Sequence, residues 1–306
     1  MTGNPGFPAA VAPRVDIDSY LRRQAGVISH QQALAAGMSR SAVKRRVSAG
    51  RWRQLHPRVY LAADRERTDE VRLRAAVLWA GTGAAAHGVS AAWWHGLWSR
   101  LPSPVAVTVP RTRTRTRTPR RRPGIALRFR TIDARDLTEY RDMPITSVAL
   151  TAIEAAVALG PKGSVLLDRA LQRYVTFGWV HRTHCRNLGC HGSAAASAML
   201  VAAADRAASH AKRLLVALLR GAGILGWELN HASEDYLIDV AFPVQRVAIE
   251  VDGWAWHTTP ERFVHDRQRQ NALANGGWQV LRFTWHDLTV RADAVIMDIR
   301  TALDSR

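Results

Sequence analysis

Cysteine is nearly absent from this chain of 306 residues, which contains only Cys185 and Cys190. So few cysteines exclude the disulfide framework that stabilises many small secreted domains. No apolar run approaches the roughly 20 residues that a membrane-spanning helix needs, and the N-terminal residues lack the apolar core of a signal peptide. We therefore expect a soluble, cytoplasmic protein that has no membrane partner.

Acidic residues are scarce in the first two thirds of the chain. Residues 1–206 contain 13 acidic and 32 basic side chains, a net charge of +19, whereas residues 207–306 contain 12 and 11, a net charge of −1. A localised positive surplus favours a polyanionic partner. We expect double-stranded DNA, and hence a nucleoid-associated protein, over the alternative of a solvated surface in an arginine-rich proteome.

The segment 15–65 has the helix-capping and turn residues of a helix-turn-helix. A capping-box pattern, "SHQQ", opens a short helix at Ser29. Gly37 can take the positive φ of the following turn, and Ser39 can cap a second helix that covers residues 40–49. This spacing predicts that the second helix enters the major groove of DNA.

The second helix has an apolar side and a basic side. Val43 and Val47 share one face, and most basic side chains lie on the opposite one. The next stretch, "GRWRQLHPRVYL", has two β-like runs broken at His56-Pro57 and predicts a basic wing. A generic three-helix bundle is the alternative. The residues that we expect to contact DNA are Arg40, Ser41, Lys44, Arg45, Arg51 and Arg53.

This segment also resembles the N-terminal winged-helix domain of AbiEi-type antitoxins. Those proteins autoregulate toxin–antitoxin operons. The resemblance implies DNA binding first and, less directly, an antitoxin role in which a cognate toxin is a partner.

The middle region, residues 66–206, is expected to combine helices with a basic hairpin. The strand-like runs "VAVTVP" and "IALRFR" flank "RTRTRTRTPRRRPG", which contains seven arginines. Contacts from such a repeat would hold phosphates without reading bases, and a solvated loop is the alternative. The arginines of the repeat that we expect to contact phosphate are Arg111, Arg113, Arg115 and Arg117.

A second cluster, "HRTHCRNLGCH" at residues 181–191, contains five potential zinc ligands. No second ligand pair follows at zinc-finger spacing. We therefore favour a His-rich helix end over a structural zinc site.

Paired carboxylates mark the chemistry of the C-terminal hundred residues. In the strand "VAIEVD", Glu250 and Asp252 share one side, and a hairpin would bring Asp239 beside Glu250. Carboxylates packed together repel one another, and a hard divalent cation such as Mg²⁺ removes that conflict. The cation would activate water for attack on a phosphodiester, with His257 as a general acid, base or phosphate donor. A soluble strand edge is the alternative.

The same residues resemble the Vsr-like (very-short-patch-repair type) endonuclease domain of the PD-(D/E)XK superfamily. The motif is D-x10-E-x-D-G-x3-H followed by D-x2-R-x3-L-x3-GW-x-VLRF, within residues 207–304. The resemblance implies Mg²⁺ or Mn²⁺ as the cofactor. It implies metal ligation by Asp239, Glu250 and the carbonyl of Val251, and a catalytic set of Asp239, Glu250, Asp252 and His257.

Two positions depart from the superfamily pattern. Asp252 replaces the usual lysine, and Lys212 stands where the opening helix usually has a glutamate. A cation at residue 212 would either substitute for the missing lysine or weaken the site. Two functions therefore stay open: a metal-dependent DNA endonuclease that nicks or cleaves, and an AbiEi-type antitoxin and regulator whose nuclease-like domain is non-catalytic.

Together these patterns predict an α+β multidomain protein. We expect a flexible N-terminus at residues 1–14 and a winged helix-turn-helix domain at 15–65. A helical and β middle domain with the Arg/Thr hairpin would follow at 66–206. An α/β restriction-endonuclease-like sandwich would occupy 207–306, in the order helix, three strands, helix, strand, helix.

Overall fold

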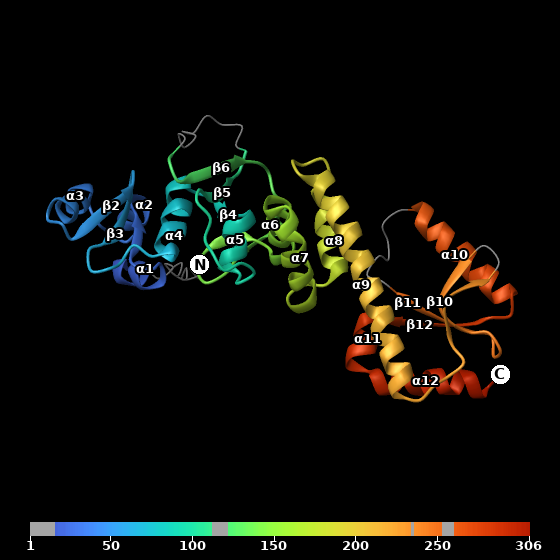
Figure 1. Ribbon diagram of the computed structural model, residues 1–306. Helices are drawn as coiled ribbons and strands as arrows, with labels where there is room; N and C mark the ends of the chain where they lie inside the picture. Colours follow the sequence, from blue (N-terminus) through green and yellow to red (C-terminus); the bar gives the residue numbers. More distant parts are fainter. Residues whose placement is uncertain (1–15, 112–121, 234–235, 253–259) are drawn as a thin grey trace, which may run out of the picture. The chain divides into compact units, whose positions relative to one another are not determined.

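The computed structural model describes residues 16–111, 122–233, 236–252 and 260–306, with the side chains of residues 252 and 260–266 left out of the description (Figure 1). The chain divides into two compact units, residues 1–159 and 160–306, and each is described by itself. Among the described residues, no helix combines the length and the apolar character needed to cross a bilayer.

The first unit opens with the predicted winged helix-turn-helix, whose three strands pair in the order β1-β3-β2. The Ser29 and Gln32 side chains form the reciprocal capping box, and the Ser39 side chain caps the next helix. That helix ends at Ser48 with Ala49 as its C-cap. The elements are α1 (Ile17–Arg23), β1 (Val27–Ser29), α2 (His30–Ala35), α3 (Arg40–Ser48), β2 (Trp52–His56) and β3 (Val59–Ala62).

A five-stranded sheet of order β6-β5-β4-β8-β7 completes the first unit. Its core includes Leu73 of α4, Trp94 of α5 and Val107 of β5. The elements are α4 (Asp69–Ala80), β4 (Ala85–Ala86), α5 (Gly88–Trp94), β5 (Val105–Val109), β6 (Ile125–Phe129), the 3₁₀ helix η1 (Ala134–Asp136), β7 (Leu137–Glu139), β8 (Pro144–Thr146) and α6 (Val148–Leu159).

The prediction that the Arg/Thr segment forms a hairpin is wrong. Strands β5 and β6 pair in parallel, with Val105 opposite Ile125 and Val109 opposite Phe129. The Arg/Thr segment therefore joins two parallel strands, whereas a hairpin would join two antiparallel ones. The alternation of side chains predicts that each run is a strand, but it carries no information about strand direction.

The second unit contains the predicted α/β sandwich, whose sheet has the order β12-β11-β10-β9. Strands β11 and β12 are parallel, and the other two pairs are antiparallel. A short helix, α11, precedes the expected closing helix. The elements are α7 (Pro161–Arg173), α8 (Phe177–Arg186), α9 (Ser193–Gly221), β9 (Glu228–Ser233), β10 (Tyr236–Phe242), β11 (Val247–Asp252), α10 (Pro260–Asn275), β12 (Gln279–Thr284), α11 (Trp285–Val290) and α12 (Ala292–Asp304).

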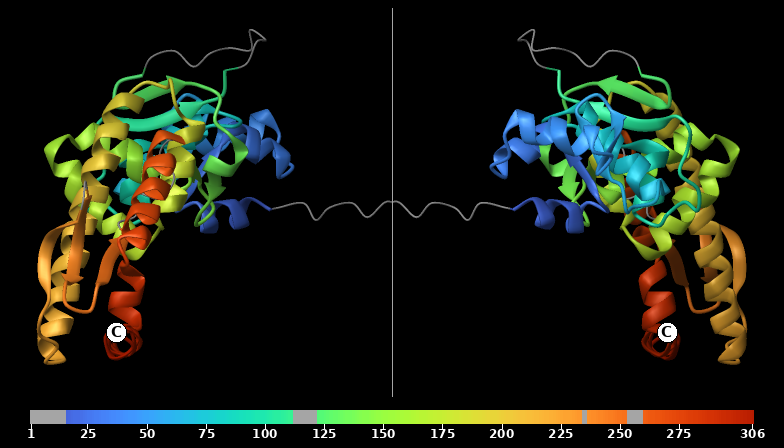
Figure 2. Two further views of the ribbon diagram at one scale, coloured as in Figure 1. Left: turned by 90° about the vertical axis from the view of Figure 1, so that its right-hand side faces the viewer. Right: turned by 90° about the vertical axis from the view of Figure 1, so that its left-hand side faces the viewer.

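Helices cover both faces of this sheet. Val247, Ile249 and Val251 pack with residues of α9, α11 and α12, whereas Ala248 packs with Leu273 of α10. Figures 1 and 2 show the long helix α9 beside the orange strands. The alternation expected for the strand is thus confirmed. The expected division at residue 207 falls inside α9, and the four-part division of the chain remains a prediction.

Candidate functional site

Three predicted metal ligands come together on two neighbouring strands. Strands β10 and β11 are antiparallel with Val240 opposite Ile249, which brings Asp239 near Glu250. The backbone N–H of Val251 donates a hydrogen bond to Asp239 Oδ2 at 3.1 Å. Asp239, Glu250 and Val251 therefore form one site at the end of the strand pair.

A lysine from α9 contacts the first carboxylate. Lys212 Nζ lies 2.6 Å from Asp239 Oδ1. The same ammonium group donates to Asn230 Oδ1 on β9 at 2.9 Å. Lys212, which departs from the superfamily pattern, thus points directly at a candidate metal ligand.

An arginine from α10 contacts the second carboxylate. Glu250 is only 5% exposed, and Arg269 Nη2 donates to its Oε1 at 2.6 Å. Burial raises the pKa of Glu250 to about 7; Arg269 opposes the rise, and the nearby charge of Asp239 adds to it. The carboxyl group is therefore poised between its neutral and charged forms near neutral pH, and a further cation would favour the charged form.

These contacts change one inference from the sequence. The proximity of the carboxylates predicted a repulsion that a divalent cation would relieve. In the structure each carboxylate already has a basic partner, Lys212 or Arg269. Sequence spacing along one hairpin cannot show contacts that arrive from helices on the two faces of the sheet.

The donor types nevertheless suit a hard cation. Carboxylate oxygens and a backbone carbonyl are ligands that Mg²⁺ prefers. In the described part of the chain, no group of three or more His, Cys, Asp or Glu side chains lies close enough to hold a metal. His257 and the side chain of Asp252 lie outside the described residues, so these two predicted catalytic groups are not placed.

The His-rich segment at residues 181–191 includes the end of α8. Cys185 Sγ lies 3.8 Å from each ring nitrogen of His181. The ring of His184 instead contacts Ser197 of α9 through Nε2 at 2.8 Å. These contacts tie α8 to its neighbour and give His184 a structural role.

The expected DNA-contact residues of the winged helix lie on the surface. Arg53 also donates to the carbonyl oxygen of Arg65. Arg111 is exposed, but Arg113, Arg115 and Arg117 lie outside the described residues. The exposed residues on α3 and around β2 are Arg40, Ser41, Lys44, Arg45, Arg51 and Arg53.

One end of the basic Arg/Thr segment lies beside the wing. Arg122, the last arginine of that segment, donates from Nε to His56 Nδ1 at 3.0 Å. His56 is the final residue of β2. Two basic regions that are far apart in the sequence thus meet within the first unit.

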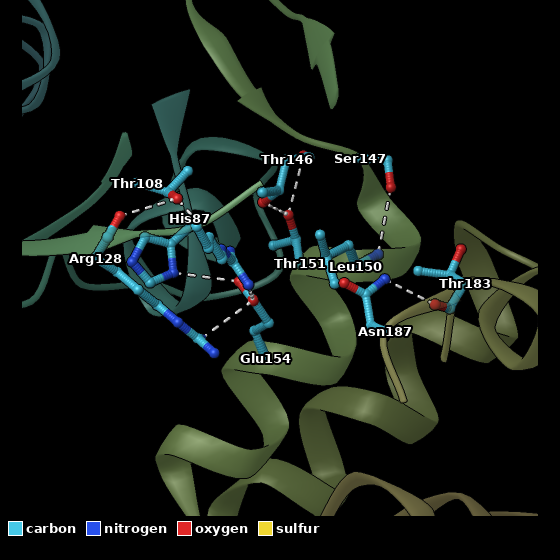
Figure 3. Close-up of polar contacts among 11 residues, drawn as sticks. His87, Thr108, Arg128, Thr146, Ser147, Leu150, Thr151, Glu154, Thr183 and Asn187 are labelled. Carbon is cyan, nitrogen blue, oxygen red and sulfur yellow. Dashed lines mark hydrogen bonds and ion pairs between the residues drawn. The ribbon is translucent and has the colours of Figure 1, made fainter. Parts of the chain in front are cut away.

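A partly buried charge cluster in the first unit was missed by the sequence analysis. Glu154 of α6 accepts hydrogen bonds from Arg130 and from His87, the latter at 3.2 Å, and Arg128 lies 3.5 Å away (Figure 3). Burial alone would raise the pKa of Glu154, but His87 and Arg130 lower it to about 2. His87 and Glu154 lie far in the sequence from each other and from the pair Arg128 and Arg130, so no local motif signals their meeting.

Three family models match parts of the chain. The model "Transcriptional regulator, AbiEi antitoxin" matches residues 16–63, and "AbiEi antitoxin C-terminal domain" matches residues 84–175. The restriction-endonuclease model REase_MTES_1575 matches residues 216–303. The chain joins AbiEi antitoxin domains to a restriction-endonuclease-like domain.

No curated protein matches the chain. Among solved structures, the catalytic domain of the homing endonuclease I-Bth0305I is 21% identical over 31% of this chain and 94% of that chain. The TM-score of that match is 0.27.

The AbiEi antitoxin region is larger than the sequence analysis predicted. The predicted resemblance covered residues 15–65, whereas a second match at 84–175 contains the Glu154 cluster. The restriction-endonuclease-like domain contains Asp239, Glu250 and Val251. Its assignment to the Vsr-like branch remains a prediction.

Proposed function

We propose that this protein binds double-stranded DNA and that its C-terminal domain hydrolyses DNA phosphodiester bonds by nicking or cleavage. The observation that carries the proposal is the meeting of Asp239, Val251 and Glu250 on β10 and β11. This meeting lies within the restriction-endonuclease-like domain.

In this proposal Asp239, Glu250 and the carbonyl of Val251 would hold Mg²⁺ or Mn²⁺. A bound divalent cation activates water and stabilises the negative charge that develops on the phosphodiester. Arg269 positions the Glu250 carboxylate, and Lys212 keeps a positive charge beside Asp239. Asp252 and His257 keep the catalytic roles that the resemblance implies.

The first unit would hold the duplex. The basic face of α3 would enter the major groove, and the wing would contact phosphates together with Arg122 and the arginines of the Arg/Thr segment. The contact between Arg122 and His56 supports a shared surface. A DNA-binding protein of this kind would act in the cytoplasm at the nucleoid.

A second function is favoured by a different observation. Two AbiEi antitoxin models match residues 16–63 and 84–175. An antitoxin and transcriptional regulator would bind its own operator and a cognate toxin, and its nuclease-like domain would be non-catalytic. The ion pair between Lys212 and Asp239 also supports this function, because a lysine competes with a cation for the carboxylate.

Two parallel assays on the full chain separate these functions. One measures nicking of supercoiled plasmid with Mg²⁺ or Mn²⁺, and the other measures binding to the DNA upstream of its own coding sequence. The endonuclease predicts nicking that requires a divalent cation. Tight operator binding without nicking under any divalent cation would establish the regulator instead.

A further inference from the structure

Helix α9 borders two adjoining cavities. One cavity of about 560 Å³ is lined by Lys212, Arg213 and Arg220 of α9 and by Asp239 of the candidate site. A second cavity, of about 440 Å³, lies between α7, α9 and Trp285 of α11. Arg213 lines both cavities, so they adjoin. We call the first, which contains Asp239, the groove, and the second the cavity.

The second cavity has an aromatic wall. The rings of Trp285 and His210 lie 4.8 Å apart at an angle of 39°, and Leu171 of α7 adds an apolar side chain. Gln172, also on α7, supplies an amide that can both donate and accept hydrogen bonds. Flat, partly apolar walls with a polar amide suit a planar heterocycle.

The charges around the two cavities differ. In the second cavity, Arg206 donates two hydrogen bonds to Asp168, at 3.0 and 2.9 Å. The charges of these two side chains therefore neutralise each other. Arg213, by contrast, has no hydrogen-bond or ion-pair partner among the residues that the structure describes. The groove thus offers a cation for phosphate, and the cavity offers a nearly neutral, aromatic lining.

We propose that this cavity receives a nucleobase turned out of the stack, while Arg213 holds the phosphate of the same nucleotide in the groove beside Asp239. Aromatic side chains bind bases of any sequence by stacking, and the volume fits one base. Enzymes that do chemistry on a DNA base turn its nucleotide out of the duplex into a pocket in this way. The inference rests on the proposed function, because the groove leads to the candidate nuclease site.

The test uses the full chain without metal and a single-stranded oligonucleotide that carries 5-iodouracil, which cross-links to stacked aromatic residues on irradiation. Peptide mapping should place the cross-link on Trp285 or His210. Trp285→Leu should lower its yield about tenfold or more, because the stacking partner is lost. Trp179→Leu is the matched control, because Trp179 lies in the same unit and is 57% exposed.

A second variant protects the test against misfolding. Arg213 is exposed, so Arg213→Gln should fold normally, and it should also reduce the cross-link to Trp285 several-fold. Cross-links confined to the winged helix, or an unchanged yield in folded Trp285→Leu and Arg213→Gln, would overturn the proposal. Nicking without this cross-link would refute only the base pocket, and the cross-link without nicking would refute only the nuclease.

Discussion

The ammonium group of Lys212 lies 2.6 Å from the carboxylate of Asp239, at the place where a divalent cation is proposed. The same carboxylate accepts a hydrogen bond from the backbone of Val251. Two contacts therefore hold the Asp239 carboxylate in place before any metal binds. A metal that shares Asp239 must tolerate a fixed positive charge beside it.

Replacing Lys212 tests this relationship. Lys212→Gln removes the charge but keeps a hydrogen-bond donor, so the repulsion between the ammonium group and a bound cation disappears. We expect the apparent affinity for Mg²⁺ to rise about tenfold, measured as the Mg²⁺-dependent increase in thermal midpoint. Arg220→Gln, on the same helix, should not change it, because the Arg220 guanidinium lies over the Trp227 ring. An unchanged Mg²⁺ response in Lys212→Gln would show that no cation shares Asp239.

The raised pKa of Glu250 predicts a specific pH dependence of stability. The pKa is about 7 in the folded protein, against 4.5 for an ordinary glutamate, so the folded state binds the proton more tightly. This contribution is fully present below about pH 4.5 and is lost as the pH rises through about 7. We expect the metal-free thermal midpoint to fall between pH 5 and about 8 in the natural protein relative to Glu250→Gln.

Added Mg²⁺ should reverse that trend, because a cation stabilises the charged carboxylate. The Mg²⁺-dependent increase in midpoint should therefore grow from pH 5 to about 8 and be absent in Glu250→Gln. If the thermal midpoints of the two metal-free proteins changed in parallel with pH, Glu250 would not titrate in this range.

The Glu154 cluster predicts the opposite pH dependence in the first unit. The pKa of Glu154 is lowered to about 2, so its stabilising contribution is present above about pH 4.5 and is lost as the pH falls through about 2. Glu154→Gln should destabilise the protein by about 3 kcal/mol at pH 7, because Arg130 and His87 lose their partly buried ionic partner.

Chemical denaturation at several pH values measures this difference. The difference in the free energy of unfolding between the natural protein and Glu154→Gln should become smaller as the pH falls. Glu139→Gln serves as the control, because Glu139 is exposed on β7. A loss below about 0.5 kcal/mol for Glu154→Gln would contradict the role assigned to the cluster.

The basic face of α3 should account for much of the DNA affinity. Reversing Arg40, Lys44 and Arg45 to Glu should weaken duplex binding by at least about a hundredfold at low salt and should flatten its salt dependence. The measurement is fluorescence anisotropy over a range of salt concentrations. Reversing three exposed basic residues of α7 provides a control with the same change in charge: Lys162, Arg169 and Arg173. Equal losses in both triple variants would show that only net charge matters.

Local signals in the sequence predicted much of the architecture. These signals depend only on neighbouring residues, and each has the expected structure. They are the capping box at Ser29, the positive-φ turn at Gly37 and the alternation of buried side chains from Val247 to Val251. The proximity of Asp239 and Glu250 was also predictable, because one tight hairpin sets their register.

Features that depend on distant segments could not be predicted in this way. The parallel pairing of β5 with β6 depends on a crossover whose direction has no local signature. The contacts of Lys212 with Asp239 and of Arg269 with Glu250 require two helices to pack on opposite faces of one sheet. The surroundings of a candidate site are thus harder to infer than its strand-borne residues.

The most direct test of the nuclease is the rate of supercoiled-plasmid nicking by purified natural protein, Asp239→Asn and Asp298→Asn with Mn²⁺ or Mg²⁺. Asp298 is an exposed carboxylate on α12 in the same unit and serves as the matched control. We predict nicking that requires the divalent cation, is preserved in Asp298→Asn, and falls at least about a thousandfold in Asp239→Asn while duplex affinity stays the same. Nicking that persists in Asp239→Asn, or that is absent from the natural protein with either cation, would contradict the account.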